Sequence, residues 1–217
     1  MNPITRLVVP FLMTLAYSAA FASGPDWEHE SATFVHDLDA AQYDTPGGQV
    51  RVKAFQALYL RAAELEKQYP ERAEPLLWSA WALLGQAGVY RNFSVLGMLN
   101  DAKAKLEAAI AIDPKIYNGA PYASLGMWNV SAADYPCFGC KKKAREYLQQ
   151  ALAMDPTGIE PNRWYAELLF KEKDYAAALK YATAAVNAPP RPGRNKADQD
   201  LRAQADKLIA QSREKLH

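Results

Sequence analysis

The sequence predicts an all-α protein, in which helical hairpins stack into a short superhelix that a C-terminal capping helix closes. Two observations lead to this prediction. One short pattern of small and apolar residues recurs three times along the chain, and each copy ends in a proline. In addition, apolar residues follow a helical period through most of the chain from residue 50 to residue 190.

In the recurring pattern, an alanine is followed at helical steps by an apolar or small residue, a second alanine and a proline. Small residues at these steps allow two helices to approach closely, and the proline ends the second helix of the pair. The three copies are Ala102, Leu106, Ala109 and Pro114; Ala144, Leu148, Ala151 and Pro156; and Ala178, Ala182, Ala185 and Pro190.

The first 22 residues have the features of a secretory signal peptide. Arg6 precedes an apolar run over 7–15, and Ala20-Phe21-Ala22 fits the small-x-small rule for cleavage. A membrane anchor is the alternative, but the run is short and Pro10 interrupts it, so it does not match about 30 Å of hydrocarbon. The sequence therefore predicts export to the periplasm.

Charge is nearly balanced, with 25 basic and 24 acidic residues. A balanced chain has no electrostatic surface suited to nucleic acid or to an anionic membrane. No stretch after the signal is long and apolar enough to cross a bilayer. We therefore expect a soluble protein without a nucleic-acid partner and without stable membrane insertion.

The elements begin with residues 23–49, where Gly, Pro, Asp and Thr recur and no helical period is sustained. This composition predicts an irregular lead-in that holds one short helix near 30–42. From Val50 an apolar helical face begins, and it ends at Pro70. This helix is expected to be the second helix of a degenerate first repeat, or a cap on the N-terminal end.

Three further hairpins are predicted, and the first helix of each opens with a recognisable set of residues. The sets are Trp81, Leu84 and Gly85 in one helix, Tyr122, Leu125 and Gly126 in the next, and Ala166 in the position of the glycine in the last. The partner helices are expected near 101–112, 141–154 and 175–187.

The prolines measure the length of each repeat. Pro156 and Pro190 are 34 residues apart, whereas the two preceding intervals are 42 and 44 residues. The extra residues fall between paired helices, at 91–100 and 131–140, where insertions in repeat proteins often meet a partner. The segment 91–100 is apolar and includes Phe93, so it either folds back on the core or contacts another protein.

The final segment, 191–217, is predicted to be a proline-rich linker followed by one charged helix over 195–215. One side of this helix is apolar and the rest is polar, a distribution that suits a capping helix. The apolar positions are Ala197, Leu201, Ala205, Leu208 and Ile209.

The chain resembles two groups of proteins. Residues 50–190 resemble tetratricopeptide repeats, because three copies of the pattern agree. Residues 70–210 also resemble the T-component family of TRAP transporters, and the step formed by Phe138, Gly139, Lys143 and Ala144 matches that family. The resemblance implies a periplasmic protein that associates with itself and with a solute-binding protein. The chain differs from the family in lacking a lipidation cysteine and in having cysteines beside Phe-Gly.

Cys137 and Cys140 form a Cys-x-x-Cys pair, for which a disulfide is the expected state in an oxidising compartment. A redox site is the alternative, since the following lysines would lower a thiol pKa, but no β-α-β pattern surrounds the pair. Zinc would need two more ligands, and the three histidines lie toward the chain ends. Lys141 stands where haem attachment needs histidine. We therefore expect no metal and no cofactor.

Partner binding is predicted on the concave groove of the superhelix and on the first insertion. The aromatic residues of the first helices, such as Trp81 and Trp164, are expected to pack against neighbouring helices, and the groove positions lie one step away from them. The predicted binding residues are Ser79, Gln86, Tyr90, Phe93, Met127, Arg163, Glu167 and Lys171.

No catalytic motif for hydrolase, phosphate-binding or zinc chemistry is found in the sequence, so we expect a non-enzymatic protein that mediates protein–protein interaction. A redox or cofactor-handling accessory that uses the cysteine pair is one alternative. A general scaffold for assembly of the cell envelope is another.

Overall fold

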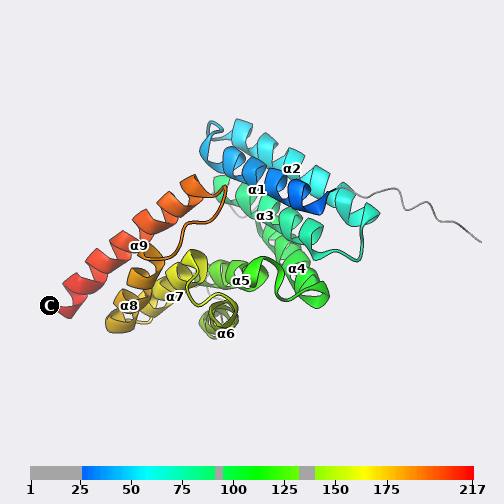
Figure 1. Cartoon of the computed structure of the whole chain (residues 1–217). Coiled ribbons are helices and arrows are strands. Elements are labelled where there is room, and N and C mark those ends of the chain that lie inside the picture. Colours follow the sequence, from blue (N-terminus) through cyan, green and yellow to red (C-terminus); the bar gives the residue numbers. More distant parts are fainter. Residues whose placement is uncertain (1–25, 91–94, 132–139) are drawn as a thin grey trace, which may run out of the picture.

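The computed structural model describes residues 26–90, 95–131 and 140–217, and these residues form helices without any β-strand (Figure 1). The predicted all-α fold is thereby confirmed. The helices are α1 (Trp27–Tyr43), α2 (Gln49–Gln68), α3 (Ala73–Val89), α4 (Leu96–Ile112), α5 (Ala120–Ser131), α6 (Cys140–Met154), α7 (Ile159–Lys171), α8 (Tyr175–Val186) and α9 (Asn195–Leu216), with a 3₁₀ turn at Ile116–Asn118 before α5.

Consecutive helices pack as antiparallel hairpins. The pairs α3–α4, α5–α6 and α7–α8 are the three predicted hairpins, while α2 packs on α3 and α9 packs on α8. Figure 1 shows α1 to α4 at one end of the molecule and α6 to α9 at the other, with α9 extending from beside α1 to the C-terminus. The first and last helices of the fold therefore approach each other across the molecule.

The alanines of the recurring pattern lie where the helices meet. All of those in the first two copies are at most 1% exposed, as are Ala178, Ala182 and Ala185 in the third. The predicted close approach also explains Gly126, because a Cβ atom there would lie 2.4 Å from Leu148 of α6. The helices then end two to four residues before the exposed prolines.

The N-terminal segment is more regular than the sequence predicted. Instead of an irregular lead-in with a short helix near 30–42, helix α1 has 17 residues. Asp26 caps its start, since its carboxylate accepts hydrogen bonds from the backbone N–H groups of Glu28 and His29. Phe34 is fully buried against α3. The apolar stripe of α1 is narrow, so the sequence gives only a weak signal for this helix. Packing on α2 and α3 stabilises the helix more than its own composition does.

The first insertion is also partly helical. Its residues 96–100 form the start of α4, and Met98 packs against the core beside α3, so this part of the predicted loop folds back on the protein. Phe93 lies outside the described residues. Cys137 also lies outside them and Cys140 begins α6, so the predicted disulfide remains a prediction.

Helix α9 caps the fold as predicted, and its apolar stripe, which includes Leu201, Ala205 and Leu208, is buried against α7 and α8. None of the helices in the described part of the chain combines the length and the apolarity needed to cross a membrane.

Candidate functional site

A cavity of about 330 Å³ lies between the first and last helices of the fold. Its lining comes from α1, α2, α3, α5, α7 and α9, so side chains far apart in sequence meet there. One part of the lining is apolar and the other is polar. The apolar part includes Phe55, Trp81, Leu84, Met127 and Trp164, and the polar part includes Asp39, Tyr43, Glu160, Arg194, Asp200 and Gln204.

Helical periodicity places these side chains on common faces. Asp39 and Tyr43 lie one turn apart in α1, and Glu160 and Trp164 are spaced in the same way in α7. Arg194 is the N-cap residue of α9 and precedes the helical turns that carry the α9 part of the lining. The cavity therefore exists only because α9 returns to α1.

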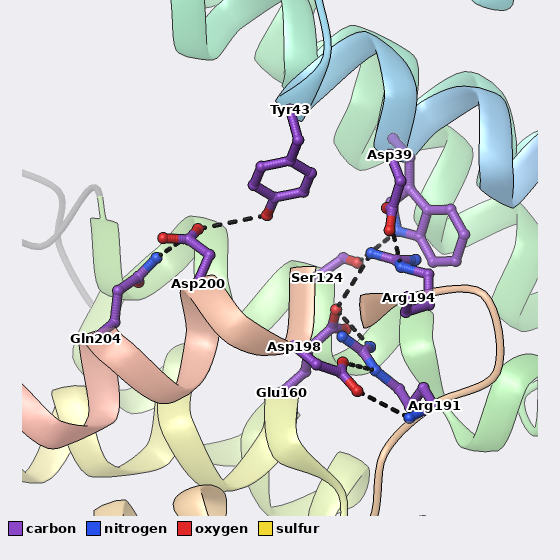
Figure 2. A network of polar contacts seen from close by, with 10 residues as sticks. Asp39, Tyr43, Ser124, Glu160, Arg191, Arg194, Asp198, Asp200 and Gln204 are labelled. Carbon is purple, nitrogen blue, oxygen red and sulfur yellow. Dashed lines mark hydrogen bonds and ion pairs between the residues drawn. The ribbon is translucent and has the colours of Figure 1, made fainter. Parts of the chain in front are cut away.

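Two arginines and three carboxylates form an ion-pair network at one side of the cavity (Figure 2). Arg191 donates from Nη1 to Glu160 Oε1 at 2.8 Å and from Nε to Asp198 Oδ1 at 2.7 Å. Its backbone N–H also donates to Asp198 Oδ2 at 2.8 Å. These bonds fix the linker before α9 on the end of α7.

Arg194 links the same network to α1. Its Nε lies 3.0 Å from Asp39 Oδ1, and its Nη2 lies 3.9 Å from Glu160 Oε1. Asp39 is only 8% exposed, and its second oxygen, Oδ2, is buried without a hydrogen-bond partner among the described residues. Burial raises the pKa of Asp39 in spite of the attraction of Arg194.

The pKa of Glu160 shifts the other way. Burial opposes its charge, but the attraction of Arg191 and Arg194, together with the hydrogen bond from Arg191, lowers its pKa overall. The network therefore favours the ionised form of Glu160.

We expect Glu160 to contribute to stability in a pH-dependent way. A lowered folded-state pKa gives stability that is present above the ordinary glutamate pKa of about 4.3 and is lost as pH falls through the folded-state value. Urea unfolding between about pH 6 and pH 3 measures this loss. The variant Glu160→Gln should be less stable at neutral pH and should lose less stability on acidification. Parallel pH profiles for the two proteins would contradict this expectation.

A second polar group lies on the α1–α9 side of the cavity. The hydroxyl of Tyr43 donates to Asp200 Oδ2 at 3.4 Å, and Gln204 Nε2 donates to the same oxygen at 2.9 Å. Burial, followed by the charge of Asp200, raises the pKa of Tyr43 to about 12. Tyr43 therefore remains a hydroxyl donor at physiological pH, and two neutral donors orient the Asp200 carboxylate.

Two tryptophans form much of the apolar part. Trp81 Nε1 donates to Ser124 Oγ at 3.0 Å, which fixes the indole beside the cavity. The Arg163 guanidinium lies 3.7 Å from the centre of the Trp164 ring. Both tryptophans pack against neighbouring helices as expected, and their partly buried side chains also line the cavity.

Among the predicted binding residues, Met127 lines the cavity. Ser79 is fully buried, and Gln86 and Arg163 are 7% exposed, so the prediction that these three face an open groove is wrong. One residue along a helix turns the side chain by about 100°, and in α7 it is Trp164, the neighbour of Arg163, that faces the cavity.

The other predicted binding residues lie elsewhere. Tyr90 follows the end of α3 and is partly exposed. Glu167 pairs with Arg163 at 2.9 Å, and Lys171 donates to the backbone carbonyl of Val130 at 3.3 Å. Phe93 lies outside the described residues. This set is therefore not gathered into a single site.

The polar lining was not predicted from the sequence. Asp39 and Tyr43 fall at the end of the short helix expected near 30–42 in an otherwise irregular lead-in, and Asp200 and Gln204 fall on a helix expected only to cap the fold. No local motif marks any of them, since their meeting depends on contacts between α1 and α9.

The lining presents carboxylates, a hydroxyl, an amide and aromatic faces, a combination suited to holding a ligand. Within the described residues, no group of three or more His, Cys, Asp or Glu side chains could hold a metal ion. In comparisons with known proteins, no family model, no curated protein and no solved structure matches this chain.

Proposed function

We propose that this chain is a non-enzymatic binding protein of the tetratricopeptide type, exported to the periplasm, that holds a protein partner on the side of its helical hairpins where the cavity opens. The observation that supports this most directly is the cavity lined by six helices, with aromatic residues and oriented polar groups together. Repeat proteins generally bind their partners through surfaces that successive repeats form together.

The resemblance to the T-component of TRAP transporters makes a solute-binding protein the proposed partner. In this role the protein docks the binding protein and associates with further copies of itself. The apolar start of α4, where Leu96 is 55% exposed, offers a contact surface in addition to the cavity.

A capture experiment tests the docking proposal. The mature protein is immobilised and mixed with periplasmic extract, and captured proteins are identified by mass spectrometry. Gln204→Trp places a large side chain at the cavity, whereas Ala203→Trp places the same side chain at the exposed neighbouring position of α9. We expect a solute-binding protein to be captured by the wild type and by Ala203→Trp, and much less by Gln204→Trp.

A separate light-scattering measurement on the purified protein gives its oligomeric state. A stable oligomer supports self-association, and a monomer contradicts it. Capture of no solute-binding protein, or equal capture by both tryptophan variants, would contradict docking at the cavity.

A further inference from the structure

We propose that the cavity between α1 and α9 is a binding site for a small organic cation with an alkyl chain, such as a diamine. This inference goes beyond the proposed docking function and does not rest on it. It rests on the charge of the lining, an unsatisfied carboxylate oxygen, the aromatic walls and the size of the cavity.

The charged residues of the lining are three carboxylates and one guanidinium. The guanidinium of Arg194 already faces Asp39 and Glu160, and behind it Arg191 faces Glu160 and Asp198. Both guanidiniums therefore have carboxylate partners within the network, although Arg191 Nη2 and Arg194 Nε have no hydrogen-bond partner among the described residues. The lining keeps an excess of negative charge, which attracts a cation and repels an anion.

Asp200 carries the least compensated of these charges. Its hydrogen bonds come from two neutral groups, the hydroxyl of Tyr43 and the amide of Gln204, and both reach Oδ2. Arg163 acts on Asp200 only at longer range, and its own ion partner is Glu167. Asp200 is also exposed, so a ligand can reach its carboxylate.

Asp39 supplies a second observation that points to a ligand. The residue is 8% exposed and lines the cavity, and its carboxylate pairs with Arg194 through Oδ1 while Oδ2 has no hydrogen-bond partner among the described residues. A buried carboxylate oxygen without a donor is unfavourable, and a bound ammonium group would relieve that cost.

The two carboxylates suit a ligand with two charged ends. Figure 2 shows Asp200 and Asp39 on either side of Tyr43. The lining also offers apolar surface from Trp81, Trp164 and Met127. Methylene groups pack on such surface, and an ammonium group within about 6 Å of an indole face gains cation–π attraction.

The volume sets the size of the ligand. Small-molecule pockets are commonly about 300–1,000 Å³, and this cavity of about 330 Å³ is at the lower end of that range. The space therefore fits a short amine, or one basic side chain of a peptide, rather than a longer segment of chain.

Isothermal titration calorimetry with the full mature protein tests the proposal. The probes are 1,5-diaminopentane, the neutral 1,5-pentanediol and the anionic glutarate, which share a chain of five carbons. We expect the diamine to bind and the diol and the diacid to give no measurable heat. Asp200→Asn should weaken diamine binding at least about tenfold, because it removes the uncompensated charge without removing volume.

Asp206→Asn is the matched control, since Asp206 is an exposed carboxylate on α9 that does not line the cavity. It should bind the diamine as the wild type does. Circular dichroism and melting temperature verify that both variants fold. Equal binding by Asp200→Asn and Asp206→Asn would overturn the proposal, as would equal affinity for the diol and the diamine.

A lysine-containing pentapeptide and its norleucine counterpart distinguish the two sources of an alkylammonium group. Binding of the lysine peptide alone supports the cation site with a partner side chain as the source, whereas binding of the diamine supports a free amine. Failure of every cation to bind overturns this inference and leaves partner capture unaffected, so the two proposals fail separately.

Discussion

Replacement of Asp198 by alanine should lower the free energy of unfolding by about 2–4 kcal/mol. Asp198 is 1% exposed, and both of its oxygens accept hydrogen bonds from Arg191. Without this carboxylate, the Nε and the backbone N–H of Arg191 lose their acceptors at a half-buried position. The loss of stability should be smaller than for a fully buried ion pair, because the Arg191 side chain is 29% exposed and keeps its ion pair with Glu160.

Urea unfolding at neutral pH, followed by circular dichroism, measures this loss. Asp206→Ala removes an exposed carboxylate from the same helix and is expected to change stability by less than about 0.5 kcal/mol. If the two variants were equally stable, the network would not hold the linker and α9 in place.

Replacement of Trp78 by alanine should have the larger effect, a loss of about 3–5 kcal/mol. Trp78 is fully buried, and its ring stacks on Phe34 of α1 with the ring centres 4.6 Å apart. Its Nε1 also donates to the Tyr117 hydroxyl at 3.3 Å. The substitution leaves a large cavity at the place where α1 docks on α3.

The same unfolding measurement, combined with limited proteolysis, tests the effect on α1. We expect earlier cleavage within 27–43 in Trp78→Ala than in the wild type, because local opening exposes a helix that has lost its packing. Trp78→Phe keeps an aromatic ring against Phe34 and should lose less stability. If residues 27–43 were an irregular lead-in, cleavage there would be rapid in the wild type and unchanged in both variants.

The sequence by itself determined the hairpins of this protein. Ala144, Leu148 and Ala151 recur at helical steps, and such a pattern specifies which face of a helix meets its neighbour in the chain. The prolines likewise mark helix ends through local sterics, and the apolar stripe of α9 identifies the capping helix. These signals are local, so they can be read without knowing the rest of the fold.

Tertiary structure alone decided the cavity and its chemistry. Helix α1 is stabilised by packing on α2 and α3 rather than by its own amphipathicity, and Asp39 and Asp200 line the same cavity only because α9 returns to α1. The orientation of Trp81 and Trp164 toward the cavity also depends on how the hairpins rotate against one another. The sequence shows which residues lie on each helix, but contacts between helices distant in sequence determine which of them face a common space.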